Sequence, residues 1–367
     1  FGCFTAIEND GSHTFETNHR NHFKKERMIK MIFAGIDIGG TKCAACIGKE
    51  SDKGELQILS KEKFDTIKDR PYDMIAVLQD SLHKQQAKMG HVPLSGIGIS
   101  CGGPLSSKTG TIMAPPNLPK WDNIPIADAF EKEFKVHTTL QNDANACAIA
   151  EWKYGSGKGT NNFAFLTFGT GFGAGLILNS QLYCGSNDIA GEIGHIRAEA
   201  DGPVGYRKHG SFEGFCSGGG IAQLGRMMVV RETAAGNMPR LLSECGDIPS
   251  INAKAIAELA EQGDALCREI YRISGEKLGK ALSIMVDLLD LDAISIGSVF
   301  TRSYHLLWDA CNKVMEQECL PICYRHCRIV KSALGDKVGD IAALAAAVYS
   351  AKSHGDSAHA SIPDELL

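Results

Sequence analysis

Short apolar segments and helical patterns follow one another along the chain. Mainly apolar runs at 31–36 and 97–100 are typical of buried strands, and the segment 136–140 is expected to be extended. Residues 72–89 place apolar side chains three or four positions apart, which predicts a helix, and 144–154 is a second clear helix candidate. Strands that alternate with helices predict an α/β fold.

The pattern strand, glycine-rich turn, strand occurs twice. The first copy spans residues 31–47 with its turn at 37–42, and the second spans 162–179 with its turn at 169–175. The two copies lie about 130 residues apart, which is the size of one domain. This recurrence predicts an internal duplication at the level of architecture, with one glycine-rich turn in each of two domains.

The chain is expected to fold as two lobes around a cleft. Residues 1–30 are polar and show no apolar period, so we expect a disordered leader outside the fold. The expected small lobe combines 31–116 with about 338–352, the large lobe covers 117–337, and the polar residues 353–367 are expected to form a loose tail. The other expected elements are helices over most of 221–289, a strand at 293–297, a break at Pro321 and a terminal helix at 341–350.

Composition and charge argue against several classes of partner. The 367 residues are 44% hydrophobic and 22% charged, which is typical of a soluble globular protein. A net charge of -5 provides no basic surface for nucleic acid or an anionic membrane, and no apolar run reaches a membrane-spanning length. The 13 cysteines are scattered and no signal peptide opens the chain, so we expect free thiols in the cytoplasm.

The first glycine-rich turn reads DIGGTK and begins at Asp37. Gly39 and Gly40 allow the chain to reverse and bring backbone N–H groups close to an anion. Thr41 adds a hydroxyl donor and Lys42 a cation, while Asp37 can hold a metal ion through water. These residue types predict a phosphate-binding turn, although a plain β-hairpin would also need the glycines.

The second turn reads TFGTGFGAG at 167–175 and has similar chemistry without the acid. Its glycines loosely match a dinucleotide-binding fingerprint, but that motif must open a helix, whereas 176–179 continues as a strand. The sequence also contains no P-loop motif. Two such turns facing each other across a cleft would hold the β- and γ-phosphates of a nucleotide from both sides.

Asp143 stands in the segment QNDANA, where a strand ends and a helix is expected to begin. Phosphoryl transfer needs a group that accepts the proton of the attacking hydroxyl, and an aspartate at the mouth of a cleft fits this role. Either Asn142 or Asp143 can also cap the helix, and capping alone would explain an aspartate here. From Asp143 alone the two interpretations are equally good.

The motifs resemble those of the ROK family, whose name stands for repressor, open reading frame and kinase. The resemblance covers roughly residues 31–350 with the motifs in the family's order and spacing. The matching segments are DIGGTK at 37–42, PNLPKW at 116–121, NDANA at 142–146, TFGTGFG at 167–173, GEIGH at 191–195, GSFE at 210–213, SG at 217–218, IGSVF at 296–300, SALG at 332–335 and GD at 339–340.

The resemblance implies an actin-like ATPase fold of the hexokinase and ribonuclease H-like type, with two lobes, mixed sheets and a central cleft. It implies a glucokinase-like sugar kinase that uses ATP and Mg²⁺, with Asp143 as the catalytic base and Asp37 near the metal through water. The positions matched to sugar binding are Gly103, Asn117, Asn142, Asp143, Glu192, His195 and Glu213. Those matched to ATP and phosphate are Gly39, Gly40, Thr41, Lys42, Thr170, Gly171 and Gly297, with the last near the adenosine.

Taken one at a time, the sugar-site residues also have structural explanations. Glu192 and Glu213 can be solvated loop acids, His195 a hydrogen-bonded structural histidine, and Asn117 a turn residue beside Pro116. Their occurrence together in matched motifs favours the functional interpretation, because a sugar ring needs several carboxylates and amides in fixed geometry.

One loop departs from the pattern of the family. Many members carry a zinc site made by the histidine of GxxGH and three cysteines of a CxCGxxGC stretch. Here the cysteine positions hold Val204, Tyr206 and Ser211, so His195 has none of the three thiolates that a closed zinc site requires. We therefore expect no zinc, and we regard His209 as a surface residue rather than a substitute ligand. The altered loop leaves the identity of the sugar open.

Two other groups of cysteines are expected to be structural. Cys43 and Cys46 fit a CxxC motif, but along a strand these positions face opposite sides. A redox-active pair lies instead at the start of a helix. Further cysteines gather around Pro321, where their irregular spacing fits no standard metal site and burial is the simpler explanation.

The expected activity is transfer of the γ-phosphoryl group of ATP to a hexose or N-acetylhexosamine, at the C6 hydroxyl and with glucose as the first candidate. N-acetylmannosamine, N-acetylglucosamine, fructose and allose remain alternatives. A ROK transcriptional regulator needs an added DNA-binding domain, for which about 30 non-periodic residues before the first strand are too few. A non-catalytic sugar sensor stays the alternative, and a homodimer is the expected assembly because two-fold dimers are the commonest closed oligomers.

Overall fold

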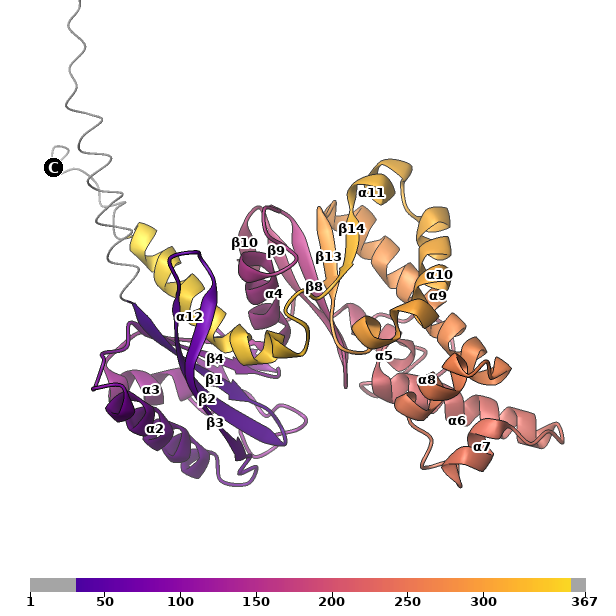
Figure 1. Ribbon diagram of the computed structural model, residues 1–367, viewed down its shortest axis with the longest axis horizontal. Helices are drawn as coiled ribbons and strands as arrows, with labels where there is room; N and C mark the ends of the chain where they lie inside the picture. Colours follow the sequence, from indigo (N-terminus) through magenta and orange to yellow (C-terminus); the bar gives the residue numbers. More distant parts are fainter. Residues whose placement is uncertain (1–30, 358–367) are drawn as a thin grey trace, which may run out of the picture.

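The computed structural model describes residues 31–357, so the expected leader at 1–30 lies outside the described residues. Its first sheet has five strands in the order β3-β2-β1-β4-β7 (Figure 1). β1, β2 and β3 form an antiparallel meander, whereas β4 and β7 continue from β1 in parallel. The strands are β1 (Ile32–Ile38), β2 (Lys42–Glu50), β3 (Leu56–Asp65), β4 (Gly96–Cys101) and β7 (Thr138–Asn142).

The second sheet repeats this arrangement in the order β10-β9-β8-β13-β14. β8, β9 and β10 form the antiparallel meander, and β13 and β14 continue from β8 in parallel. The duplication expected from the two glycine-rich turns is therefore confirmed in the strand order. The strands are β8 (Phe163–Phe168), β9 (Phe172–Leu178), β10 (Gln181–Tyr183), β13 (Ala293–Ile296) and β14 (Arg328–Lys331).

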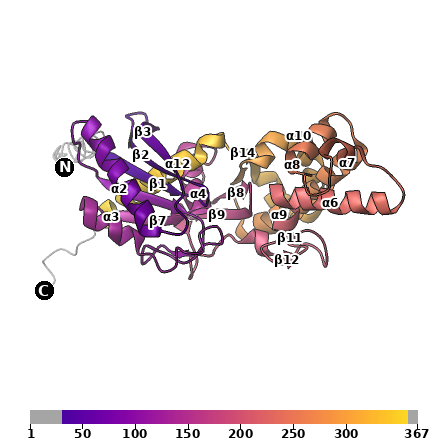
Figure 2. The same cartoon turned by 90° about the horizontal axis from the view of Figure 1, so that it is seen from below.

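Helices cover both faces of the first sheet, as Figure 2 shows from a second direction. α2 (Pro71–Lys88) and α3 (Ile126–Phe134) lie on one face, where Met74, Leu78 and Leu82 of α2 are buried in its core. α12 (Val338–Ser357) lies on the other face and packs against β1 and β4. The helical spacing of apolar residues between 72 and 89 is thus explained by one buried helix face.

The second sheet is also covered on both faces, and the side chains of β8 alternate between them. Ala164, Leu166 and Phe168 join the core formed with the large helices, whereas Phe163 and Phe165 face α4. The helices are α4 (Asp143–Tyr154), α5 (Phe212–Phe215), α6 (Gly218–Ala234), α7 (Arg240–Cys245), α8 (Ala253–Glu261), α9 (Ala265–Leu289), α10 (Val299–Glu318) and α11 (Pro321–His326). Short elements are β5 (Leu105–Ser106), β6 (Thr111–Ile112), η1 (Ile193–His195), β11 (Val204–Gly205), β12 (Lys208–His209) and η2 (Gly335–Lys337).

α4 and α12 pack against each other between the two sheets. Glycines let both helices approach the strands closely. A Cβ atom at Gly98 of β4 would lie 2.0 Å from the carbonyl oxygen of Ala343 in α12, and one at Gly175 of β9 would lie 2.3 Å from that of Ala144 in α4. The two sheets are therefore joined by direct packing of this pair of helices.

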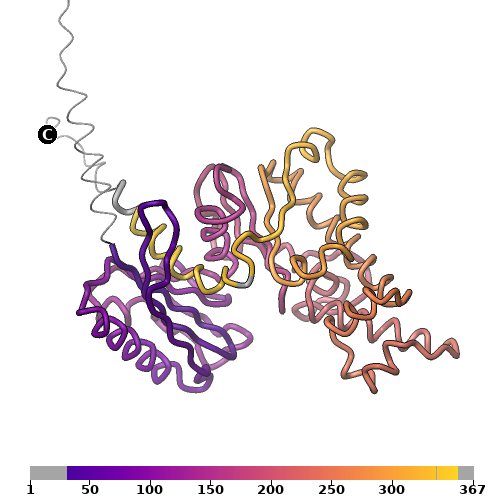
Figure 3. Tube along the Cα trace, viewed as in Figure 1, coloured from indigo at the N-terminus to yellow at the C-terminus, as the bar shows by residue number. Residues whose placement is uncertain are grey.

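The chain passes between the lobes twice, from β7 into α4 and from β14 to α12 (Figure 3). The expected boundary at residue 116 is wrong, because β7 pairs in parallel with β4 and brings residues up to Asn142 into the first sheet. Distant pairing of this kind leaves no mark on the sequence between the two strands.

Some element boundaries also differ from expectation. β9 begins at Phe172, so the second turn is restricted to residues 169–171. β3 and β14 were not expected, and α12 extends to Ser357, which makes the start of the expected tail helical. Pro321 does begin a separate helix, as expected. Among residues 31–357, no helix combines the length and apolar character needed to cross a bilayer.

The close contact between β4 and α12 predicts that two glycines of the same strand differ in their tolerance of a side chain. Gly98→Ala should destabilise the protein by about 1–3 kcal/mol, because the new methyl group meets helix backbone that cannot move aside. Gly96→Ala is the matched control, since the nearest atom to its Cβ position lies at 3.5 Å, an ordinary contact. Thermal and urea unfolding measure both variants, and equal midpoints would contradict the packing described.

Candidate active site

A cavity of about 540 Å³ lies where the two lobes meet. Its lining comes from the loop after β4, the start of α4, the turn between β8 and β9, and the segments around η1 and α5. Residues far apart in sequence are thereby brought together. The expected site residues that line it are Gly103, Asn142, Asp143, Thr170, Gly171, Glu192, His195 and Glu213.

Asp143 is the first residue of α4, and Asn142 is the residue that caps the helix. The backbone N–H of Ala144 donates to Asn142 Oδ1 at 2.9 Å and to Asp143 Oδ1 at 2.8 Å. Asp143 is exposed to the cavity but surrounded by atoms of both lobes, and this desolvation raises the pKa of its carboxyl. Asn142 is the N-cap of α4, and Asp143 lines the cavity although its Oδ1 shares the Ala144 N–H with Asn142.

Two glutamates lie near Asp143. Desolvation, followed by the charges of Asp143 and Glu213, raises the pKa of Glu192. Glu213 Oε2 accepts a hydrogen bond from the N–H of Phe172 at 3.2 Å, directly after the second glycine-rich turn. A Cβ atom at Gly171 would lie 3.0 Å from this oxygen, so the turn and the carboxylate are in contact.

His195 is held by the β11–β12 hairpin. The rings of His195 and Tyr206 meet edge to face with centroids 5.9 Å apart, and Lys208 Nζ donates to the carbonyl oxygen of His195 at 2.6 Å. Tyr206 and Arg207 form the hairpin turn with φ of 37° and 65°, a conformation that costs energy for large side chains. Tyr206 also lines the cavity, so it belongs to the site although the sequence pointed to it only as a missing zinc ligand.

The first glycine-rich turn lies between β1 and β2, and its residues do not line this cavity. Gly39 N–H donates to Lys42 O at 3.0 Å, which closes the turn. A Cβ atom at Gly40 would lie 2.5 Å from Asn117 Cβ, so the structure places Asn117 against the turn rather than in the cavity lining. Lys42 pairs with Asp65 on the surface, away from the cavity.

Asp37 lies near the end of β1, close enough to the catalytic candidate Asp143 for their charges to interact. Burial, together with the negative charges of Asp143 and Asp340, raises the pKa of Asp37 to about 7, and the charges of Lys61 and Lys63 oppose this shift. Asp340 itself pairs with Lys61 of β3. The negative charges around Asp37 would attract a cation, and carboxylate oxygens are ligands that suit Mg²⁺.

Gly297 follows β13 and lies beside the second turn. Its N–H donates to the carbonyl oxygen of Leu166 at 3.1 Å, and the next residue, Ser298, has φ of 56° before α10 begins. Ser298 Oγ lies 3.5 Å from a Cβ atom placed at Gly169. The structure therefore brings Gly297 next to the turn that contains Thr170 and Gly171.

Asp188 is a residue of the cavity that sequence reasoning missed. Its carboxylate accepts hydrogen bonds from the backbone N–H of Ser107 at 2.9 Å and from its hydroxyl at 2.5 Å. Ser107 follows β5 in the first lobe, whereas Asp188 lies in the loop between β10 and η1. The pair bridges the lobes at the cavity, and no local motif around Asp188 could have indicated it.

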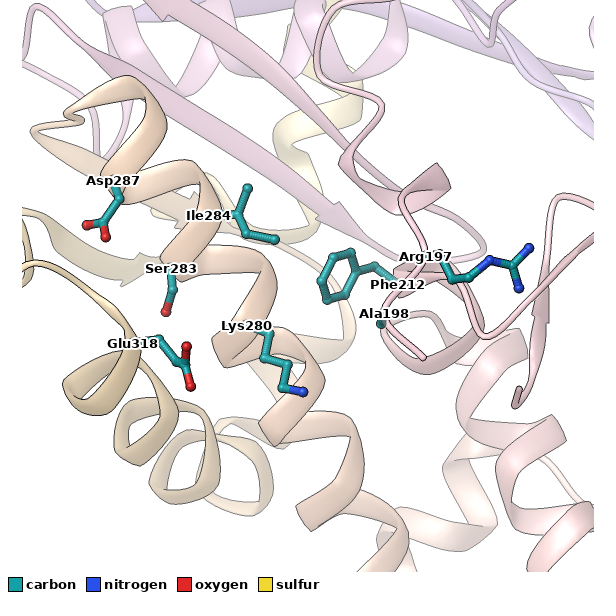
Figure 4. Close-up of a pocket in the computed structure, with 8 residues that line it drawn as sticks. All are labelled: Arg197, Ala198, Phe212, Lys280, Ser283, Ile284, Asp287 and Glu318. Atoms are coloured by element: carbon teal, nitrogen blue, oxygen red, sulfur yellow. The ribbon is translucent and has the colours of Figure 1, made fainter. Parts of the chain in front are cut away.

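A second cavity of about 410 Å³ lies on the large lobe between α9 and the loop that leads to α5 (Figure 4). Phe212 lines it, while the next residue, Glu213, lines the first cavity. Two of its charged groups already have partners: Lys280 Nζ lies 3.5 Å from Glu199, and Asp287 accepts from the N–H of Leu320 at 3.0 Å. The first cavity, with its cluster of carboxylates, is therefore the candidate active site.

Comparison with known proteins identifies the family. The model of the ROK family matches residues 33–349. The chain belongs to the ROK family. Its actin-like ATPase fold, expected from the motif resemblance, is confirmed by the solved ROK structures that it matches.

Three ROK proteins illustrate the similarity. The glucokinase of Streptomyces coelicolor is 29% identical over 313 residues, which cover 84% of this chain and 95% of that protein. The N-acetylmannosamine kinase of Yersinia pseudotuberculosis is 27% identical over 263 residues, covering 71% and 81%. A ROK family glucokinase from Streptomyces griseus, solved with glucose and AMPPNP, is 29% identical with a TM-score of 0.67, covering 87% of this chain and 99% of that one.

The loop that departs from the ROK zinc motif forms the hairpin beside His195. Of the residues at the cysteine positions, Val204 and Tyr206 lie in this hairpin, and Ser211 caps the N-terminus of α5. Within residues 31–357, no three His, Cys, Asp or Glu side chains are grouped so as to hold a metal ion. Cys43 and Cys46 belong to separate cores on opposite faces of the first sheet, as their spacing predicted.

Asp37 should make the stability of the metal-free ROK protein depend on pH. Its pKa is about 7 in the folded protein and 3.8 in the unfolded chain. Asp37 therefore does not lower the free energy of unfolding below pH 4, where it is protonated in both states, but lowers it progressively as the pH rises towards 7. Between pH 5 and 7 the free energy of unfolding should fall by on the order of 2 kcal/mol from this group. Unfolding in the presence of EDTA measures the change, and Asp37→Asn should remove it; an identical pH dependence in both proteins would contradict this origin.

Proposed function

We propose that this ROK protein is an ATP-dependent sugar kinase that phosphorylates a hexose or N-acetylhexosamine, at C6 and with glucose as the first candidate. The observation that carries the proposal is Asp143, which lines the cavity with a raised pKa while Asn142 caps the helix. Glucokinases and an N-acetylmannosamine kinase among the relatives support the same reaction and the same two classes of acceptor.

The lining of the cavity supports a sugar as the acceptor. Glu192, Glu213 and His195 present carboxylate and imidazole groups from one lobe, and Asn142 and Gly103 approach from the other side. Several hydroxyl groups on a ring need this kind of convergent polar surface. We assign Asn117 a supporting role, because it contacts the phosphate turn at Gly40 rather than the cavity.

The proposed step is an in-line displacement. Asp143 accepts the proton of the sugar hydroxyl, the hydroxyl oxygen forms a bond to the γ-phosphorus, and the bond to the bridging oxygen of ADP breaks. Desolvation makes Asp143 a stronger base than a carboxylate in water. The hydrogen bonds from Ser107 to Asp188 join the two lobes beside the cavity. A sugar that fills the cavity would displace water from it, which would favour the sugar over water as the acceptor.

The two glycine-rich turns are proposed to hold the phosphates of ATP. Thr170 and Gly171 would bind them from the large lobe, and Gly39, Gly40, Thr41 and Lys42 from the small lobe, with Gly297 near the adenosine. Asp37 would hold Mg²⁺ through water, which fits its raised pKa among other carboxylates. Bound Mg²⁺ would supply positive charge that neutralises the phosphate oxygens.

Replacement of Asp143 tests the base. Asp143→Asn should lower kcat for sugar-dependent ADP release by about 10²–10⁴-fold, because the amide cannot accept the proton. Sugar binding, measured by calorimetry, should change by no more than about threefold, since size and polarity are kept. Asp247→Asn, an exposed carboxylate outside the cavity, is the matched control and should keep full activity. Full turnover in Asp143→Asn would refute this mechanism.

The panel of acceptors for this assay should include glucose, N-acetylmannosamine, N-acetylglucosamine, fructose and allose. The sugar with the highest kcat/KM identifies the substrate of the enzyme. If the wild-type protein binds a sugar but turns none of them over, the non-catalytic sensor replaces the kinase. The proposed cytoplasmic, homodimeric state is measured independently by fractionation and light scattering.

The replaced cysteines predict that activity does not need zinc. Turnover with Mg-ATP should survive a zinc chelator such as 1,10-phenanthroline, because Val204, Tyr206 and Ser211 offer no thiolate beside His195. Metal analysis of the purified protein should find no stoichiometric zinc. One zinc per chain, or loss of activity that added zinc restores, would show that other residues complete the site.

A further inference from the structure

The second connection between the lobes is fastened by a buried carboxylate that the proposed reaction does not use. Glu151 lies near the end of α4 and is 0% exposed. Its Oε1 accepts hydrogen bonds from the N–H of Leu334 at 2.9 Å and from the hydroxyl of Ser332. Both residues belong to the segment that leads from β14 in the large lobe to α12 in the small lobe.

The other oxygen of Glu151 is equally occupied. Oε2 accepts from the N–H of Ser156 at 2.8 Å, from its hydroxyl at 2.7 Å, and from the N–H of Ala333 at 3.3 Å. A buried carboxylate is costly unless hydrogen bonds replace its hydration. Five donors do so here, and three of them come from the connection between the lobes.

The position of Glu151 along α4 relates it to Asp143. The helix begins at Asp143, where the first connection crosses from the small lobe, and Glu151 stands eight residues later, about 12 Å along the axis. The second connection is bound at that point. One helix therefore holds both connections, one at each end.

The second connection leads directly into the helix that supports the first glycine-rich turn. α12 packs against β1 and β4, and β1 leads directly into the first glycine-rich turn with Asp37 at its end. α12 also packs against α4. A displacement of residues 332–334 would move α12, and with it the turn that is proposed to hold phosphates.

We propose that Glu151 is a positioning residue, which pins the second connection to α4 and makes this helix the axis about which the small lobe closes. This rests on the proposed kinase function. Asp143 then lies on the axis and stays aligned with the sugar, while the first glycine-rich turn swings towards it. Loss of the pin leaves sugar binding intact but spreads the small lobe over more orientations, so fewer complexes reach the reactive geometry.

Asp292 provides a matched control within the same protein. Its Oδ2 accepts from the N–H groups of Asn161 and Asn162 at 2.8 and 2.9 Å, and its Oδ1 lies 3.0 Å from His326 Nε2. All of these partners lie in the large lobe, so Asp292 fastens a loop without joining the lobes. A general loss of stability should appear in both variants, whereas a loss of lobe positioning should appear in only one.

The experiment compares Glu151→Gln and Asp292→Asn by hydrogen exchange and steady-state kinetics. Glutamine keeps the shape of Glu151 but turns one acceptor into a donor, so it opposes at least one backbone N–H. Exchange at Ala333 and Leu334 should accelerate by about 10- to 100-fold in Glu151→Gln. In the same variant kcat should fall by about 10-fold or more, while the calorimetric affinity for the best sugar changes by less than about twofold.

Asp292→Asn should lower the melting temperature and accelerate exchange at Asn161 and Asn162, but its kcat below the melting temperature should match the wild type. The proposal is overturned if Glu151→Gln retains wild-type kcat, or if Asp292→Asn loses as much kcat as Glu151→Gln. If the wild-type protein phosphorylates no sugar, the proposed function fails separately. Hydrogen exchange then still tests whether Glu151 holds the second connection. Unchanged protection of Ala333 and Leu334 in Glu151→Gln would overturn that role without any assay of activity.

Discussion

The packing of α4 against α12 between the two sheets is the contact on which the site depends. Each helix lies so close to its own sheet that a side chain on the underlying strand would collide with helix backbone, and glycines at Gly98 and Gly175 remove that side chain. Backbone held at such short range leaves little freedom for sliding. The two lobes therefore meet through a well-defined pair of helices, with the cavity at the start of one of them.

This arrangement explains how a duplicated fold produces an asymmetric site. Both copies supply a glycine-rich turn between antiparallel strands, yet only the first carries an acid, Asp37. α4 begins with an acid, Asp143, that lines the cavity, whereas the acid in the first turn of α12, Asp340, pairs with Lys61. Desolvation and the charges of neighbouring carboxylates raise the pKa values of Asp37 and Glu192, so repulsion as well as burial acts on these two groups.

Much of the architecture could be predicted from local patterns. Apolar spacing identified α2, the glycine-rich turns identified the duplication, and the order of motifs identified the family. β3 and β14 were missed because their residues are only partly buried and show no continuous apolar run. The lobe boundary was misplaced because the pairing of β7 with β4 joins two strands that are separated in the chain by β5, β6 and α3.

The sequence by itself determined which chemical groups the protein has: two phosphate-type turns, a helix-start aspartate, the sugar-type carboxylates, and a loop without zinc thiolates. Only the tertiary structure decided how they are used. It assigned the helix cap to Asn142 and placed Asp143 in the cavity lining, set Asn117 against Gly40, and joined Asp188 to Ser107 across the lobes. The reason is physical: local propensity depends on neighbours in the chain, whereas desolvation, charge repulsion and hydrogen bonding depend on neighbours in space.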